Sequence, residues 1–83
     1  MQLEIITPDR KVFSGEATSV TFPGIEGQFQ VLNDHAPMVS TLARGPVTIQ
    51  TAGSGQQVFT VDGGVVEVLR NKVLVLAEAV LAA

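Results

Sequence analysis

The sequence carries few residues that could do chemistry, and their spacing assembles no familiar active site. Its single histidine, His35, follows Asp34 in a polar loop and could serve as a base or as a pH-sensitive contact. A histidine satisfied locally by Asp34 or by the backbone is the simpler interpretation. One histidine and no cysteine exclude multi-histidine metal sites and thiolate nucleophiles. Because phosphate-binding loops, dinucleotide fingerprints and His-Glu-x-x-His motifs are also missing, we expect no catalytic residue, metal or cofactor.

Charge and hydropathy narrow the classes of function further. Five Lys and Arg against eight Asp and Glu leave a net charge of −3, which gives no cationic field to attract nucleic acid. Apolar residues make up 46% of the 83 residues, and the charged fraction of 16% is below the usual ~25%. This balance excludes intrinsic disorder. The longest apolar runs, 73–77 and 79–83, are far shorter than the ~20 residues of a membrane span. No signal or transit peptide is recognisable, so we expect the protein to work in a cytoplasm or equivalent compartment.

Residue types that favour β-strands dominate the sequence, so strands are the elements expected to position any site. The chain has 13 valines, 4 isoleucines and 7 threonines, and apolar and polar residues alternate between turn signals at short intervals. Turns are expected at residues 43–46 and 62–64, where Gly-Pro and Gly-Gly interrupt the alternation. The predicted strands are 2–7, 11–13, 17–22, 28–32, 38–42, 47–51, 57–61, 65–69 and 72–77.

Two segments depart from simple alternation. Residues 72–77 are apolar on both faces, which predicts a strand between two packed layers. Residues 77–83 are rich in Ala and Leu and favour a short helix, although seven residues cannot hold a helix alone. A chain of eight to ten short strands is expected to close into an all-β sandwich or flattened barrel, because closure leaves few free strand edges.

Six longer segments carry more information than composition does. They are Leu3-Glu4-Ile5-Ile6-Thr7-Pro8, Val12-Phe13-Ser14-Gly15-Glu16, Phe22-Pro23-Gly24-Ile25-Glu26-Gly27-Gln28-Phe29, Val31-Leu32-Asn33-Asp34-His35-Ala36-Pro37-Met38, Gly63-Gly64-Val65-Val66-Glu67-Val68 and Val73-Leu74-Val75-Leu76-Ala77-Glu78. Their order and spacing are similar to those of the epsilon subunit of F-type ATP synthase, over about residues 3–78. The resemblance implies a flattened, ten-stranded β-sandwich of two sheets over residues 1–78, with a short helical or disordered tail at 79–83. Many relatives continue into a C-terminal helical hairpin, and this chain ends where that hairpin would begin. We expect a short form that lacks the helical domain, and a longer chain cut at Ala83 would have the same sequence.

The family resemblance also implies a role and a set of contacts. The sandwich would be a non-catalytic central-stalk subunit, monomeric within the assembly, that joins the gamma subunit to the membrane c-ring and turns with them. It would lie peripherally at the cytoplasmic face of the bacterial inner membrane and touch the membrane only through the complex. By position, the residues that would contact gamma are Thr7, His35 and Met38. Those that would contact the c-ring are Glu26, Gly27, Gln28 and Phe29.

Two positions depart from the family pattern. Gln28 stands where many relatives carry Glu, which would replace a charged ring contact with a neutral hydrogen bond. Asn33-Asp34 replaces a common Pro-Gly pair and changes the expected shape of the loop before His35.

Two other classes of protein remain as alternatives. A lipoyl- or biotinyl-type carrier domain is also small, acidic and all-β, and it would present a lysine at a hairpin tip. Lys72 follows Asn71 and Lys11 follows Arg10, neither in the Met-Lys or Asp-Lys context of such carriers. A sugar-binding sandwich would display exposed Trp or Tyr to stack on sugar rings, and the sequence contains neither.

Overall fold

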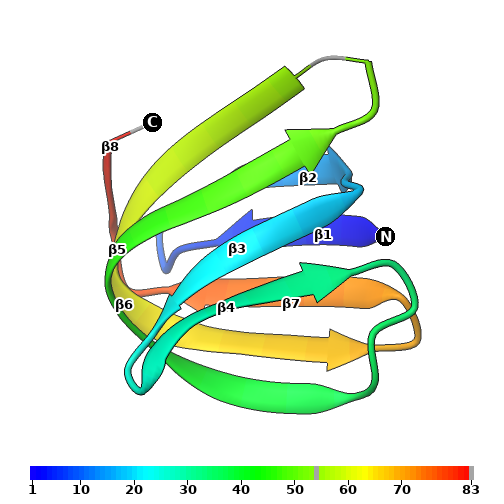
Figure 1. The fold of residues 1–83 in the computed structure, drawn as a ribbon. Helices are drawn as coiled ribbons and strands as arrows, with labels where there is room; N and C mark the ends of the chain where they lie inside the picture. The colour runs from blue at the N-terminus through cyan, green and yellow to red at the C-terminus, as the bar shows by residue number, and fades with distance from the viewer. Residues whose placement is uncertain (54, 83) are drawn as a thin grey trace.

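The computed structural model describes residues 1–53 and 55–82, which form eight strands of one hydrogen-bonded sheet (Figure 1). Within these residues every regular element is a strand. The all-β class expected from the alternation is confirmed, with eight strands instead of ten. The strands are β1 (Gln2–Ile6), β2 (Lys11–Glu16), β3 (Ser19–Gly24), β4 (Gly27–Leu32), β5 (Met38–Thr51), β6 (Gly55–Leu69), β7 (Lys72–Ala77) and β8 (Val80–Ala82).

The sheet coils on itself into two layers. The strand order is β2-β1-β7-β6-β5-β3-β4, with β8 beside β6. The first layer holds β2, β1, β7, residues 62–69 of β6 and residues 38–44 of β5. The second layer holds residues 45–51 of β5, residues 55–61 of β6, β8, β3 and β4. Figure 1 shows β5 in green and β6 in yellow curving from one layer into the other, so the layers that were expected as two sheets are continuous.

Glycines allow β6 to turn the corner without leaving the sheet. Gly63 and Gly64 have φ of +80° and +141°, a region that favours glycine. A Cβ on Gly64 would lie 2.4 Å from the carbonyl oxygen of Leu76 and 2.9 Å from the Cα of Ala77. The pairing of β5 with β6 continues on both sides of this point, from Leu42↔Gly64 to Arg44↔Asp62. The turns predicted at 43–46 and 62–64 are therefore wrong: both segments are bends, and each merges two predicted strands into one.

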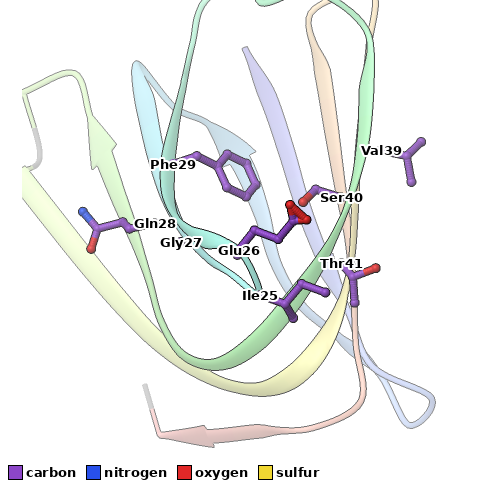
Figure 2. A pocket seen from close by; sticks show the side chains of 9 residues that line it. Ile25, Glu26, Gly27, Gln28, Phe29, Val39, Ser40 and Thr41 are labelled. Carbon is purple, nitrogen blue, oxygen red and sulfur yellow. The ribbon is translucent and has the colours of Figure 1, made fainter.

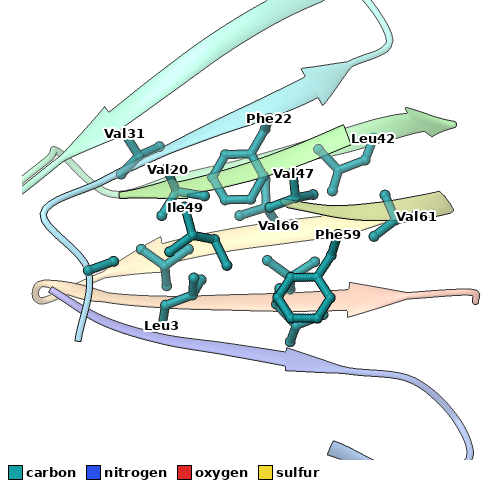
Figure 3. Packing of buried hydrophobic residues seen from close by; sticks show 14 of the residues in the cluster. Leu3, Val20, Phe22, Val31, Leu42, Val47, Ile49, Phe59, Val61 and Val66 are labelled. Atoms are coloured by element: carbon teal, nitrogen blue, oxygen red, sulfur yellow. The ribbon is translucent and has the colours of Figure 1, made fainter. Parts of the chain in front are cut away.

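The core lies between the two layers and comes from the predicted alternation. Figure 3 shows residues of β3, β5 and β6 meeting Leu3 of β1 across the interior. Two aromatic pairs add to it: Phe22 and Phe29 have ring centroids 5.4 Å apart, and Phe13 meets Phe59 edge-on at 5.8 Å. The largest fully buried side chains are Phe22, Leu3, Ile5, Ile49, Val20, Val31, Val47, Val61, Val66, Val68 and Val75.

The strand β7 differs from its prediction on one face. Val73 and Val75 are buried, but Leu76 exposes 51% of its surface. Only one side of β7 therefore faces the core, because the first layer is covered on one side alone. The apolar residues of its outer side stay exposed in the isolated chain.

The tail differs from the expected short helix. Residues Val80–Ala82 form β8, which pairs with β6 through Val61↔Val80 and Thr60↔Ala82. The amide of Asp62 also donates to the carbonyl of Ala79 at 3.0 Å. The open edge of β6 offers unpaired backbone groups, and pairing with them outweighs the helix propensity of so short a segment. Residue 83, which was included in the predicted tail, lies outside the described residues.

Gly64→Ala is expected to lower the free energy of unfolding by about 3 kcal/mol, through backbone strain and the collision with β7. Gly15→Ala is the matched control, since its Cβ would meet only the ring of Phe13 at 3.4 Å and should change stability by less than about 0.5 kcal/mol. Urea unfolding of both variants measures the difference. Equal stabilities would show that the corner in β6 does not depend on glycine.

Candidate functional site

The outer side of the first layer carries a contiguous set of apolar side chains, which we call the outer apolar face. These residues alternate with core residues along their strands and so point away from the core. Leu76 is the cross-strand partner of both Ile6 on β1 and Val65 on β6. Scattered exposed hydrophobics are ordinary, whereas a contiguous set marks an interaction surface. The outer apolar face comprises Ile6, Val39, Val65, Leu69, Leu74 and Leu76.

Charged side chains surround the middle of this face. Glu4 and Glu67 lie on either side of Leu74, because both are its cross-strand partners. A hollow of about 230 Å³ lies there, with Lys72 at its rim. The Lys11 Nζ pairs with Glu4 Oε2 at 2.9 Å. The face thus has an apolar row formed by Ile6, Leu76 and Val65, next to charged side chains that flank Leu74. Protein–protein interfaces usually combine apolar and polar groups in this way.

Thr7 lies at one end of the outer apolar face, directly after Ile6. Its Oγ1 accepts hydrogen bonds from the amides of Asp9 and Arg10, each at 3.3 Å. Its own amide donates to the carbonyl of Arg10 at 2.9 Å. Thr7 therefore shapes the turn between β1 and β2 and places that turn beside the exposed face.

His35 lies at the opposite end of the first layer from Thr7. Its loop is tied to the β6–β7 turn, since the amide of Asp34 donates to Asn71 Oδ1 at 2.8 Å. The Asn71 carbonyl in turn accepts from the amide of Gln2 at 3.1 Å, at the start of β1. His35 is half-buried, and its Nδ1 lies 2.8 Å from the carbonyl oxygen of Ala36. The His35 ring therefore has a hydrogen-bond partner in its own loop, as the simpler interpretation predicts. The outer apolar face lies between Thr7 at one end and His35 at the other.

Met38 and Val39 point to opposite sides of β5. Met38 packs partly against the core, although it also lines a surface hollow of about 330 Å³ with Pro37 and Leu69. Val39 exposes 68% of its surface and pairs with Glu67 in the first layer. The sequence analysis named Met38 and missed Val39. The alternation from the buried Leu42 backwards along β5 could have identified Val39 as the outward residue.

A second surface lies where the β3–β4 hairpin approaches the beginning of β5. Figure 2 shows this hollow, of about 470 Å³, with Glu26 and Phe29 on the hairpin side and Ser40 and Thr41 on β5. Gly24 must be glycine here, because a Cβ would lie 2.6 Å from the carbonyl oxygen of Gly27. We call this site the hairpin hollow; it is lined by Gly24, Ile25, Glu26, Gly27, Gln28, Phe29, Val39, Ser40 and Thr41.

The hairpin residues proposed from the sequence are brought together in this hollow. In Figure 2 the Gln28 side chain points away from β5, whereas Glu26 extends toward it. Phe29 is half-buried and packs on Phe22, so it serves the core as well as the hollow. The contribution of β5 was missed, because residues 39–41 are adjacent to the hairpin only in space. Ile25, 62% exposed at the hairpin tip, was also missed.

Neither lysine of the carrier-domain alternative occupies a hairpin tip. Lys72 is the first residue of β7, after a turn made by Arg70 and Asn71 with φ of +52° and +60°. Lys11 begins β2 and pairs with Glu4. In residues 1–53 and 55–82, no group of three or more His, Asp or Glu could hold a metal ion. Across the same residues, no helix has the length and apolar character needed to cross a membrane.

Comparison with known proteins gives consistent matches along the whole chain. The family model described as "ATP synthase, Delta/Epsilon chain, beta-sandwich domain" matches residues 1–83. The ATP synthase epsilon chain of Salinibacter ruber is 41% identical over 88 residues, covering 96% of this chain and 59% of the relative. That of Chlorobium limicola is 40% identical over 79 residues, covering 95% of this chain and 90% of the relative. The chain thus spans little more than half of some relatives and nearly all of others.

Solved structures agree with this fold. A chain in the mitochondrial ATP synthase of Euglena gracilis superposes with a TM-score of 0.89 at 22% identity, covering 96% of this chain and 51% of that one. A chain in the central stalk and c-ring structure of the Tetrahymena thermophila mitochondrial enzyme gives 0.82 at 19% identity, covering 98% of this chain and 65% of that one. At these identities the likeness concerns the fold alone. Taken with the family model and the bacterial relatives, it establishes that this chain belongs to the family of ATP synthase delta/epsilon-chain β-sandwich domains.

Proposed function

We propose that this chain is a non-catalytic central-stalk subunit of a proton-translocating F-type ATP synthase. It joins the gamma subunit to the c-ring and turns with both, so that ring rotation is coupled to ATP synthesis. Its family membership and the epsilon-chain names of its bacterial relatives support this role. It works peripherally, on the cytoplasmic side of the bacterial inner membrane, and contacts the membrane through the complex.

The observation that carries the proposal is that one sheet presents two candidate binding surfaces, which adjoin at Val39. The outer apolar face is broad and apolar, as a lasting protein partner requires. The hairpin hollow is smaller, with mixed polar and apolar lining. Val39 contributes to both the hairpin hollow and the outer apolar face. A module that holds two partners through one close-packed body transmits movement between them with little slack.

We assign the gamma subunit to the outer apolar face and the c-ring to the hairpin hollow. Thr7 and the His35 loop border the two ends of the outer apolar face, where gamma would cover them. Met38 adds a contact at the His35 end through the hollow it lines. Glu26, Gly27, Gln28 and Phe29 form the hairpin side of the ring contact.

Removal of the chain should uncouple the enzyme. Membrane vesicles that carry the synthase without this subunit are expected to lose most ATP-driven proton pumping, because the joint between gamma and the ring is missing. Adding back the purified chain should restore pumping, measured by quenching of a pH-sensitive dye. Vesicles that pump equally well without the chain would contradict the proposal.

Val65→Asp should weaken binding to purified gamma by about 100-fold, because it places an unpaired carboxylate in the desolvated interface. Val58→Asp is the matched control. Val65 and Val58 both lie on β6 and expose 38% and 39% of their surfaces, but Val58 lies in the second layer, opposite Thr48. Calorimetric titration gives both affinities. If the two variants bind gamma equally, the outer apolar face is not its binding surface.

His35→Asp should weaken the gamma complex by at least about tenfold, because the loop loses its solvent on binding and would trap a second carboxylate beside Asp34. His35→Gln, whose amide can still hydrogen bond in the loop, should recover most of the affinity. Both variants are compared by titration against gamma, with thermal melting to confirm folding. An unchanged affinity for His35→Asp would leave His35 as a locally satisfied loop residue.

A further inference from the structure

Two hydrogen bonds from distant parts of the chain hold the loop that carries His35. The amino group of Met1 donates to Asn33 Oδ1. The amide of Asp34 donates to Asn71 Oδ1 at 2.8 Å, across 37 positions of the sequence. Asp34 directly precedes the histidine, so of these two bonds the one to Asn71 acts nearer to the His35 ring.

The backbone of Asp34 has a conformation that benefits from such a bond. Its φ of +60° lies in the left-handed region, which L side chains adopt at a cost and glycine adopts freely. A residue in this region persists where its surroundings hold it there. The bond from the Asp34 amide to Asn71 is a contact of that kind.

Asn71 is itself fixed by its main chain. It is the second residue of the tight turn between β6 and β7, in which Arg70 and Asn71 both have positive φ and the flanking Leu69 and Lys72 are paired. The Asn71 carbonyl also accepts the amide of Gln2 at 3.1 Å. The side-chain oxygen of Asn71 therefore connects the His35 loop to three strands of the first layer, β1, β6 and β7.

The bond between Asp34 and Asn71 should matter more for binding than for folding. Both residues are exposed in the free chain, where water can replace the bond, so its contribution to stability is small. When a partner covers the loop, an Asp34 amide without an acceptor would be left unsatisfied away from water, which is costly. A loop that is already held in its bound shape also loses less conformational freedom on binding.

We propose that Asn71 is a positioning residue for gamma binding. Its Oδ1 holds the Asp34 backbone and so presents His35 in the conformation that gamma binds. This inference rests on the proposed function, and it adds to the gamma surface a residue that acts through the His35 loop instead of by direct contact.

The first test removes the side-chain oxygen and keeps the turn. Asn71→Gly retains the main-chain carbonyl and suits a φ of +60°. It should weaken binding to purified gamma about tenfold in calorimetric titration, while the melting temperature changes by less than about 3 °C. Arg70→Gly is the matched control. Arg70 shares the turn and has φ of +52°, and within residues 1–53 and 55–82 its side chain makes no hydrogen bond or ion pair with the loop. This control should bind gamma within about twofold of the unsubstituted chain.

A double substitution separates positioning from direct contact. His35→Ala removes the side chain that Asn71 is proposed to present. In that background Asn71→Gly should weaken gamma binding by less than about twofold, because little contact is left to position. If the two losses instead multiply, Asn71 acts independently of His35, and the proposal is overturned.

Hydrogen exchange provides a readout that needs no substitution. In the free, unsubstituted chain the Asp34 amide should exchange several-fold more slowly than in an unstructured peptide, because it is hydrogen-bonded. Adding gamma should slow this exchange by a further tenfold or so. An Asp34 amide that stays unprotected in the complex would overturn the proposal, even if Asn71→Gly fails to fold.

The outcomes distinguish this inference from the proposed function. If the unsubstituted chain does not bind gamma, the central-stalk role itself fails. If it binds, but Asn71→Gly binds equally well, the positioning role alone is overturned. If Asn71→Gly loses affinity and also melts well below Arg70→Gly, Asn71 serves the fold as a whole, and the positioning role is again overturned.

Discussion

The architecture depends on one steric condition, the absence of a side chain at Gly64, where β6 pairs with the end of β7. Gly64 lies so close to the Leu76 carbonyl and the Ala77 backbone that no Cβ fits between them. This close approach lets β6 change direction while its pairing with β5 continues. Because both strands keep their partners around the corner, the two layers share one hydrogen-bond network. The outer apolar face and the hairpin hollow are positioned relative to each other by that network.

Alternation in the sequence was sufficient to predict the class of the fold and most of its interior. Val20, Phe22 and Val31 are buried as their spacing indicated, since period-two patterns directly encode which side of a strand meets the core. The two corners could not be predicted in this way. Gly-Pro and Gly-Gly mark a backbone that must depart from a straight strand, but a chain reversal and a bend use the same residues. The outcome is decided by whether the flanking segments find partners across the sheet, which a linear pattern does not contain.

The candidate site was predictable to the extent that it is local. The β3–β4 hairpin was identified through a contiguous motif, and its residues do line one hollow. The β5 side of that hollow depends on a contact between segments more than ten residues apart, formed only after the sheet coils. The same limit applies to Met38 and Val39. Successive residues of a strand always point to opposite sides, but which of these two faces the core depends on how β5 lies between the layers, where Leu42, on the same side as Met38, is buried.

The continuity of β5 and β6 determines how the module responds to mechanical load. Their ladder runs from Met38↔Val68 to Thr51↔Gly55, and its hydrogen bonds lie perpendicular to the strands. A force directed along these strands would pull on all of those bonds in shear, so that they resist together. A force that peeled one strand from the edge would open them in succession, as a zipper opens. The sheet is therefore mechanically strongest against a force transmitted along β5.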